Sequence, residues 1–81
     1  MSVISPYATE KTFALIEKEN SLQFIVDRDA DKESIRREVE TLFDVKVVKV
    51  TVKSGKKGKV ATVRLEAENS ASELATRIGV V

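Results

Sequence analysis

The sequence predicts an α+β fold: an antiparallel three- to four-stranded sheet with helices on both faces, which is a three-layer α/β/α sandwich. Helical and strand patterns follow one another as helix, strand, helix, strand, strand, helix, without the regular βαβ repetition of a parallel sheet. A turn with two glycines separates the last two strand patterns, which predicts a hairpin and therefore an antiparallel pair.

The first helix is expected at residues 9–18, "TEKTFALIEK". Thr9 has the side chain of a good N-cap, and Glu10 places a negative charge in the first turn. Phe13 and Ile16 share the apolar face of this helix.

Residues 21–27, "SLQFIVD", alternate between apolar and polar positions and are expected to form the first strand. The stretch "DRDADK" breaks that pattern, and Asp29 or Asp31 can cap an amphipathic helix of about three turns that follows. The apolar face of that helix holds Ile35, Val39, Leu42 and Phe43. Its outer face holds Arg36, Arg37 and Glu40.

Two further strands are expected at residues 45–53 and 60–66, joined by the turn "SGKKG". Alternation predicts that the inner face holds Val48, Val50, Val52, Ala61, Val63 and Leu65. It predicts that the outer face holds Lys49, Thr51, Lys53, Thr62, Arg64 and Glu66. The apolar residues on the second sheet face predict a helix over part of it, and these are Ile25, Val45, Val47 and Val60.

The last helix has the clearest limits. "SASE" supplies a capping box through Ser70 and Glu73, and Gly79 supplies the stop signal. The apolar face of this helix holds Leu74, Ala75 and Ile78.

The composition restricts the class of protein. The chain has 81 residues, for which we expect one domain over residues 1–81. It has no Cys and no His, which excludes disulfides and thiolate metal ligands and removes the commonest neutral-pH acid–base group. No apolar run approaches the roughly 20 residues of a membrane span, and the start lacks a signal-peptide pattern. We therefore expect a cytoplasmic protein without membrane insertion.

The charges are divided unequally along the chain, although the net charge is only +1. The segment from Val45 to Leu65 holds seven bases and no acid, whereas the rest holds seven bases and 13 acids, a net charge of −6. Such a separation attracts a polyanion to one side of a protein. The alternative explanation is an edge hairpin whose lysines prevent aggregation.

Catalytic and metal-binding patterns are absent from the sequence. The hydroxyl groups lack a His or Cys partner, and helix faces and caps explain the carboxylates. "SGKKGK" lacks P-loop spacing, and "DRDADKES" lacks the Gly and the final Glu of a calcium loop. We therefore expect no enzyme activity, no metal site and no cofactor.

The basic hairpin "KSGKKGK" favours phosphate binding. Its glycines let the backbone approach a ligand closely, and its lysines neutralise phosphates without reading sequence. Aromatic residues are scarce, and Phe24 and Phe43 fall on core faces, so a base-stacking sheet of the RRM type is not expected. We therefore expect the protein to recognise the phosphate backbone and the shape of a structured RNA.

Several segments together resemble the large-subunit ribosomal protein of the L twenty-three family, the universal tunnel-exit protein, in its archaeal type. "ISPYATEKT" at residues 4–12 resembles the P-x-x-T/S-E-K segment near the start of that family. Residues 22–52 resemble its strand, helix and second strand, and "KKGKVATVRL" its basic turn and following strand. "ELATRIGVV" resembles the archaeal ending, so the match covers essentially the whole chain.

The resemblance implies a structural, non-catalytic protein of the large ribosomal subunit. Such a protein binds large-subunit rRNA near the polypeptide exit tunnel and helps to form a docking surface for factors that meet nascent chains. The implied partners are the neighbouring ribosomal protein L twenty-nine, the signal recognition particle and the protein-conducting channel, with the protein a monomer within the ribosome. Bacterial members carry a long hairpin extension, whereas the turn here is only "SGKKG".

The charge pattern and the resemblance together give the candidate site residues. The candidate rRNA-binding residues are Thr9, Lys11, Lys49, Lys53, Lys56, Lys57, Lys59 and Arg64, and the candidate for factor docking is Glu10. Some of them have a structural alternative, because Thr9 and Glu10 also suit the start of a helix.

Two other functions stay open on the residues alone. A small regulatory or interaction domain with a ferredoxin-like sandwich would need a pocket for a metabolite or a protein, and the sequence names no convergent polar groups for one. An acylphosphatase-like enzyme would need a phosphate-cradling loop with an Arg and a catalytic Asn. Asn20 and Asn69 flank expected elements and have no such loop nearby.

Overall fold

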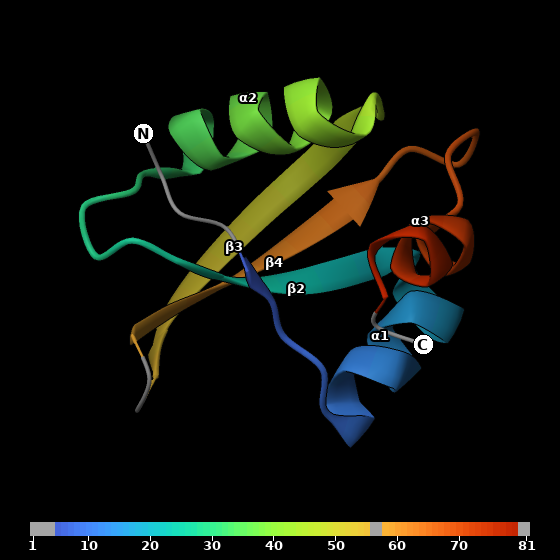
Figure 1. Ribbon diagram of the computed structural model, residues 1–81, viewed down its shortest axis with the longest axis horizontal. Coiled ribbons are helices and arrows are strands. Elements are labelled where there is room, and N and C mark those ends of the chain that lie inside the picture. Colours follow the sequence, from blue (N-terminus) through green and yellow to red (C-terminus); the bar gives the residue numbers. More distant parts are fainter. Residues whose placement is uncertain (1–4, 56–57, 80–81) are drawn as a thin grey trace.

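The structure, a computed structural model, describes residues 5–55 and 58–79. The elements in these ranges are β1 (Ser5–Pro6), α1 (Glu10–Glu19), β2 (Ser21–Val26), α2 (Lys32–Phe43), β3 (Val47–Gly55), β4 (Gly58–Leu65) and α3 (Ala71–Ile78). Over the described ranges the strands form a four-stranded antiparallel sheet in the order β1-β2-β4-β3 (Figure 1). None of the helices in these ranges has the length and apolar character needed to cross a membrane. That residues 1–81 form one domain stays a prediction.

Helices lie on both faces of the sheet, as the sequence predicts. Consecutive residues of a strand point to opposite faces. Phe24 of β2 stacks on Phe43 of α2, with ring centroids 5.8 Å apart, whereas the neighbouring Gln23 is bonded to Thr12 of α1. The α2 and α1 helices therefore cover opposite faces. Figure 1 shows α3 beside α1 and away from α2, and α3 also contacts β2.

The predicted helix caps are present. Thr9 caps α1, and of the two candidates for α2 it is Asp31 that serves as N-cap. The Ser70 hydroxyl accepts a bond from the Glu73 backbone N–H, which is half of the predicted capping box. Gly79 ends α3 with a φ of 83°, a conformation that favours glycine.

The core lies on the sheet face that α2 covers and continues under α3. Its fully enclosed side chains are dominated by Phe24, Leu22, Ile35, Leu74, Val39 and Val63. These residues come from β2, α2, β4 and α3, so the core joins elements from both ends of the chain.

The predicted alternation is wrong at the start of β3. Val47 pairs with Leu65, and Lys49 pairs with Arg64, so Val48 is the extra residue of a β-bulge. Since a shift of one residue exchanges the two faces of a strand, Val47 is buried with the core instead of lying on the second face. Val48 was predicted to face inward and is 58% exposed.

Two helical residues also differ from the expected apolar faces. The buried stripe of α1 runs through Thr12 and Ile16, which are one turn apart, and this leaves Phe13 at its margin and 39% exposed. In α2 the inward stripe ends at Val39 and Phe43, so Leu42 is 57% exposed. The sequence analysis also missed β1, which is short and contains a Pro, as edge strands tolerate.

Candidate nucleic-acid interface

The sheet face opposite α2, called the outer face below, has three cross-strand rows of residues, most of them polar. The strand register places Tyr7, Gln23, Thr62 and Thr51 in the first row. It places Ser21, Arg64 and Lys49 in the second, and Ile25, Val60 and Lys53 in the third. Tyr7 belongs to the first row because its backbone N–H donates to the carbonyl of Gln23 at 3.0 Å, which continues the pairing of β1.

A buried polar network fixes α1 over the outer face. The Thr12 hydroxyl is fully enclosed and donates to Gln23 Oε1 at 2.7 Å. Gln23 Nε2 in turn donates to Thr62 Oγ1 at 3.2 Å. The same Thr12 oxygen accepts from the Thr9 N–H at 3.1 Å, so the helix cap and the sheet share one side chain.

A groove of about 490 Å³ opens between α1 and the outer face. The side chains that matter for its chemistry are Tyr7, Lys11, Glu19, Gln23, Lys53 and Thr62. The groove therefore offers an aromatic ring, a side-chain amide, hydroxyl groups and two ammonium groups to a ligand. It also contains one carboxylate, that of Glu19 at the end of α1.

Candidate cations gather on this side of the molecule. Lys11 and Lys53 line the groove, while Lys49 and Arg64 are cross-strand neighbours on the same face. All four are exposed. Within the described residues none of them forms an ion pair, so their charge is not neutralised by a nearby carboxylate.

Lys59 lies apart from this group. It pairs with Val26, a core-face residue, and its ammonium group donates to the carbonyl of Ala30 at 3.4 Å. Together with Arg28 it lines a hollow of about 370 Å³ beside the ends of β3 and β4. Lys56 and Lys57, the other candidates at the hairpin tip, lie outside the described residues.

Thr9 and Glu10 occupy the start of α1. The Thr9 hydroxyl accepts from the Thr12 N–H at 3.2 Å, which confirms its structural role as N-cap. A phosphate contact by Thr9 stays a prediction. Glu10 is exposed in the first turn, where the partial positive charge of the helix N-terminus favours a carboxylate.

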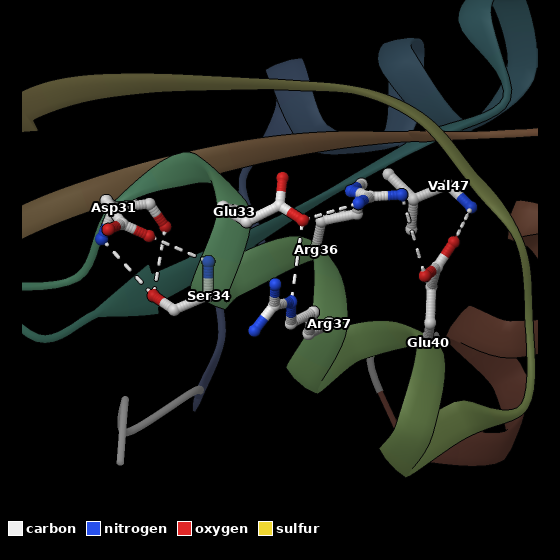
Figure 2. Close-up of polar contacts among 7 residues, drawn as sticks. All are labelled: Asp31, Glu33, Ser34, Arg36, Arg37, Glu40 and Val47. Atoms are coloured by element: carbon white, nitrogen blue, oxygen red, sulfur yellow. Dashed lines mark hydrogen bonds and ion pairs between the residues drawn. The ribbon is translucent and has the colours of Figure 1, made fainter.

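The charges of α2 form a separate, internally balanced cluster (Figure 2). Glu33 pairs with Arg36 and also with Arg37, whose Nε lies 3.4 Å from Glu33 Oε1. The hydrogen bond from Arg36 lowers the pKa of Glu33 and raises the pKa of Arg36 itself. Among the described residues, both arginines of α2 are thus already paired with acids, unlike the four cations of the outer face.

Two other acids of α2 act on the backbone. The Ser34 N–H donates to Asp31 Oδ1 at 2.7 Å, and this bond lowers the pKa of the Asp31 carboxyl. Glu40 Oε2 accepts from the backbone N–H of Val47 at 3.0 Å, as Figure 2 shows. Glu40 therefore ties the end of α2 to the residue that precedes the β-bulge.

Both asparagines that could supply the catalytic Asn of an acylphosphatase-like site have structural roles. The Asn20 side-chain amide lies within hydrogen-bond distance of the carbonyls of Leu65, Glu66 and Asn69, and its Oδ1 accepts from the Ala71 N–H. The Asn69 Oδ1 accepts from the backbone N–H of Lys46, the residue that precedes β3.

The residues that complete the groove were not predicted as site residues from the sequence. Gln23, Thr51 and Thr62 were placed on polar strand positions, but the row that joins them depends on the register between distant strands. Tyr7 joins that row through a two-residue strand that no periodicity reveals. Arg28 stands in a charged turn and gives no signal of its own.

Comparison with known proteins decides the family. The family described as "Ribosomal protein L23" matches residues 2–72 of the chain. The chain belongs to the ribosomal protein L23 family. This confirms the resemblance noted in the sequence.

Archaeal relatives in this family match the chain over nearly its full length. The Large ribosomal subunit protein uL23 of Thermoplasma acidophilum is 54% identical over 78 residues, which cover 96% of this chain and 93% of that protein. The uL23 of Picrophilus torridus is 49% identical over 78 residues, with 96% and 95% covered. That of Methanobrevibacter smithii is 47% identical over 79 residues, with 96% and 92% covered.

Membership of the L23 family sets the general function. The chain is a structural protein of the large ribosomal subunit and not an enzyme, and its place is the cytoplasmic ribosome. The predicted association with translation and with archaeal ribosomal proteins is likewise confirmed.

Proposed function

We propose that the chain binds large-subunit rRNA through the outer face and the start of α1. The observation that carries this proposal is the set of four exposed cations on one side of the molecule that have no acidic partner within the described residues: Lys11, Lys49, Lys53 and Arg64. Folded RNA is a polyanion, and each phosphate that such a cation neutralises releases counterions and strengthens binding.

The remaining candidate residues would add contacts beside this surface. Lys59 lines, with Arg28, the hollow beside the end of β3 and the start of β4, and Lys56 and Lys57 stand between these two strands in the sequence. Thr9 adds a hydroxyl next to Lys11 at the start of α1. Contacts of this kind fix the orientation of a protein on RNA without reading the base sequence.

The second part of the proposal concerns location and factor docking. We propose that the chain lies near the polypeptide exit tunnel, beside ribosomal protein L twenty-nine, and receives the signal recognition particle and the protein-conducting channel. Its support is the T-E-K segment at Thr9, Glu10 and Lys11, together with the exposure of Glu10. Binding of purified signal recognition particle to ribosomes that carry Glu10→Lys measures this role, and unchanged affinity would remove Glu10 from the docking surface.

The test of rRNA binding is an affinity measurement with a folded large-subunit rRNA fragment across a salt series, with tRNA as competitor. The Lys49→Ala/Arg64→Ala variant is expected to reduce the slope of log K against log salt by about two units, because two phosphate contacts are lost. The matched control is Lys32→Ala/Arg37→Ala, which removes two bases from α2 and is expected to leave the slope unchanged.

The same titration distinguishes this proposal from its alternative. If the slope of both double variants equals that of the wild-type protein, Lys49 and Arg64 do not contact phosphate, and the charge of Lys49 on the edge strand β3 only opposes aggregation. Binding no tighter than to tRNA would mean that the chain does not recognise the shape of rRNA.

A further inference from the structure

We propose that the groove between α1 and the outer face accepts one unpaired RNA base, with Tyr7 stacking on it and Gln23 and Thr62 bonding its edge. This inference rests on the proposed rRNA binding. It goes beyond phosphate contact, because it gives the protein a way to recognise one nucleotide by its base.

The bonding capacity of Gln23 is the first argument. Only 8% of this residue is exposed, and it lines the groove. A Gln amide has two donor protons and two acceptor positions, and Gln23 uses one of each, toward Thr62 and Thr12. Gln23 therefore keeps one unused donor and one unused acceptor on a side chain that lines the groove and that the fold already holds in place.

The arrangement of the first row is the second argument. Tyr7 and Thr62 lie on either side of Gln23, so about two strand spacings, roughly 10 Å, separate them. All three residues line the groove, so a planar base in it can lie against the ring of Tyr7 and reach the hydroxyl of Thr62. Because Thr62 Oγ1 accepts from Gln23, its own proton is available for a base atom.

The size and the charge of the groove suit a whole nucleotide. Its volume of about 490 Å³ falls in the range of sites that bind small organic molecules. Lys11 and Glu19 both line it and are eight residues apart on α1, which is roughly 12 Å. The phosphate of the bound nucleotide is therefore expected near Lys11 and Lys53, away from the carboxylate of Glu19.

The unused donor and acceptor of Gln23 suit the edge of a base, and a Gln side chain commonly pairs with adenine through one donor and one acceptor. In an unpaired adenine the N6–H and N1 atoms on the Watson–Crick edge offer that pair of bonds. Unpaired bases in RNA loops and bulges are recognised by stacking on aromatic rings and by bonds to their edges. We therefore expect an unpaired adenine of the rRNA in this groove.

The test uses dimethyl sulfate, which methylates exposed adenine N1, on the rRNA fragment of the salt series. The wild-type protein is expected to protect one unpaired adenine, and Tyr7→Ala is expected to lose that protection. The same variant should bind the fragment about tenfold more weakly, which is within the effect of removing one base stack, and with an unchanged salt slope. Tyr7→Phe retains the ring and is the matched control.

The outcomes separate the two proposals. Salt-dependent rRNA binding in which no adenine is protected, or in which Tyr7→Ala still protects it, overturns the base site and leaves the phosphate proposal standing. Absence of rRNA binding by the wild-type protein overturns both. If thermal unfolding shows that Tyr7→Ala is not folded, Thr62→Val carries the test. Full protection and wild-type affinity in that variant would contradict the proposal.

Discussion

The Thr12 hydroxyl occupies a position at which helical periodicity would place an apolar side chain. It is fully buried, yet it bonds to the backbone of Thr9 and to the amide of Gln23. A buried polar group is tolerated when its bonds are made, and here those bonds also orient the start of α1 against the sheet. The geometry of the groove thus depends on one side chain that does not line it.

Replacing Thr12 by Val tests this role, because Val has nearly the same shape and lacks the hydroxyl. We expect Thr12→Val to lower the free energy of unfolding by about 1–3 kcal/mol, since Gln23 Oε1 loses its donor. Thr12→Ser keeps the hydroxyl and should lose less. Urea denaturation measures both variants, and a loss for Thr12→Val no larger than that for Thr12→Ser would contradict this role of the hydroxyl.

Helix α2 begins with two carboxylates whose pKa values lie below their ordinary values of 3.8 for Asp31 and 4.5 for Glu33. A group with a lowered folded-state pKa stabilises the folded protein fully above its unfolded-state pKa. That stabilisation is lost as the pH falls through the folded-state value. The stability that these two groups supply is therefore present at neutral pH and disappears in acid, below about pH 4.5.

We predict that Asp31→Asn/Glu33→Gln has a shallower loss of stability in acid than the wild-type protein. The slopes of stability against pH are expected to differ only below about pH 4.5, because only there do the wild-type carboxylates take up protons. Urea denaturation at a series of pH values from neutral to 2 measures it. Glu68→Gln removes an exposed carboxylate outside α2 and serves as control. Parallel curves for the wild type and the double variant would contradict the prediction.

The β-bulge of β3 gives two valines on the same strand opposite environments. Val48 is largely exposed, whereas Val50 is 8% exposed and packs in the core. We predict that Val48→Thr changes the free energy of unfolding by less than about 0.5 kcal/mol. Val50→Thr should cost about 1–3 kcal/mol, because it buries a hydroxyl group. Similar losses in chemical denaturation would mean that the strand has the unbulged register.

Local patterns predicted most of the fold. The caps at Thr9, Asp31 and Ser70 and the stop at Gly79 act within a few residues, and such signals are visible in the sequence. The bulge was not visible, because the tie between Glu40 and the backbone of Val47 exists only once α2 packs on β3.

The charged residues of the candidate site could be predicted from the sequence, but the groove between α1 and the outer face could not. Lys49, Lys53 and Arg64 were correctly expected on the polar face of the hairpin, because alternation holds beyond the bulge. Lys59 falls on the other face, since it pairs with Val26. The groove itself could not be predicted, because it requires α1 to lie across a row of residues from four separate parts of the chain.

The folded protein has two sides of different electrostatic character. On α2 each Arg is close to a Glu, whereas on the outer face Lys49 and Arg64 stand opposite each other without an acid. Like charges directly opposite in a sheet are destabilising. In the free protein Lys49 and Arg64 therefore repel each other weakly, and a bound polyanion would remove that repulsion.

We predict opposite effects of Arg64→Gln on stability and on binding. The free energy of unfolding of the free protein should rise by about 0.5 kcal/mol at low salt, because the repulsion with Lys49 is removed. Affinity for the rRNA fragment should fall in the same variant. Thermal unfolding in low and high salt measures the first effect, and a lower stability at low salt would contradict it.

The strand order also determines when the chain is able to fold. The central pair of the sheet joins β2 to β4, and the bonded residues Gln23 and Thr62 are 39 positions apart. At a synthesis rate of roughly 5–20 residues per second, about 2–8 seconds separate the production of the two strands. During that time β2 has only the two-residue β1 as a partner, and its apolar residues Leu22 and Phe24 lack their sheet neighbour. Folding of the newly made chain therefore waits for its last third, and until then β2 stays open to aggregation for longer than β3, which is made just before β4.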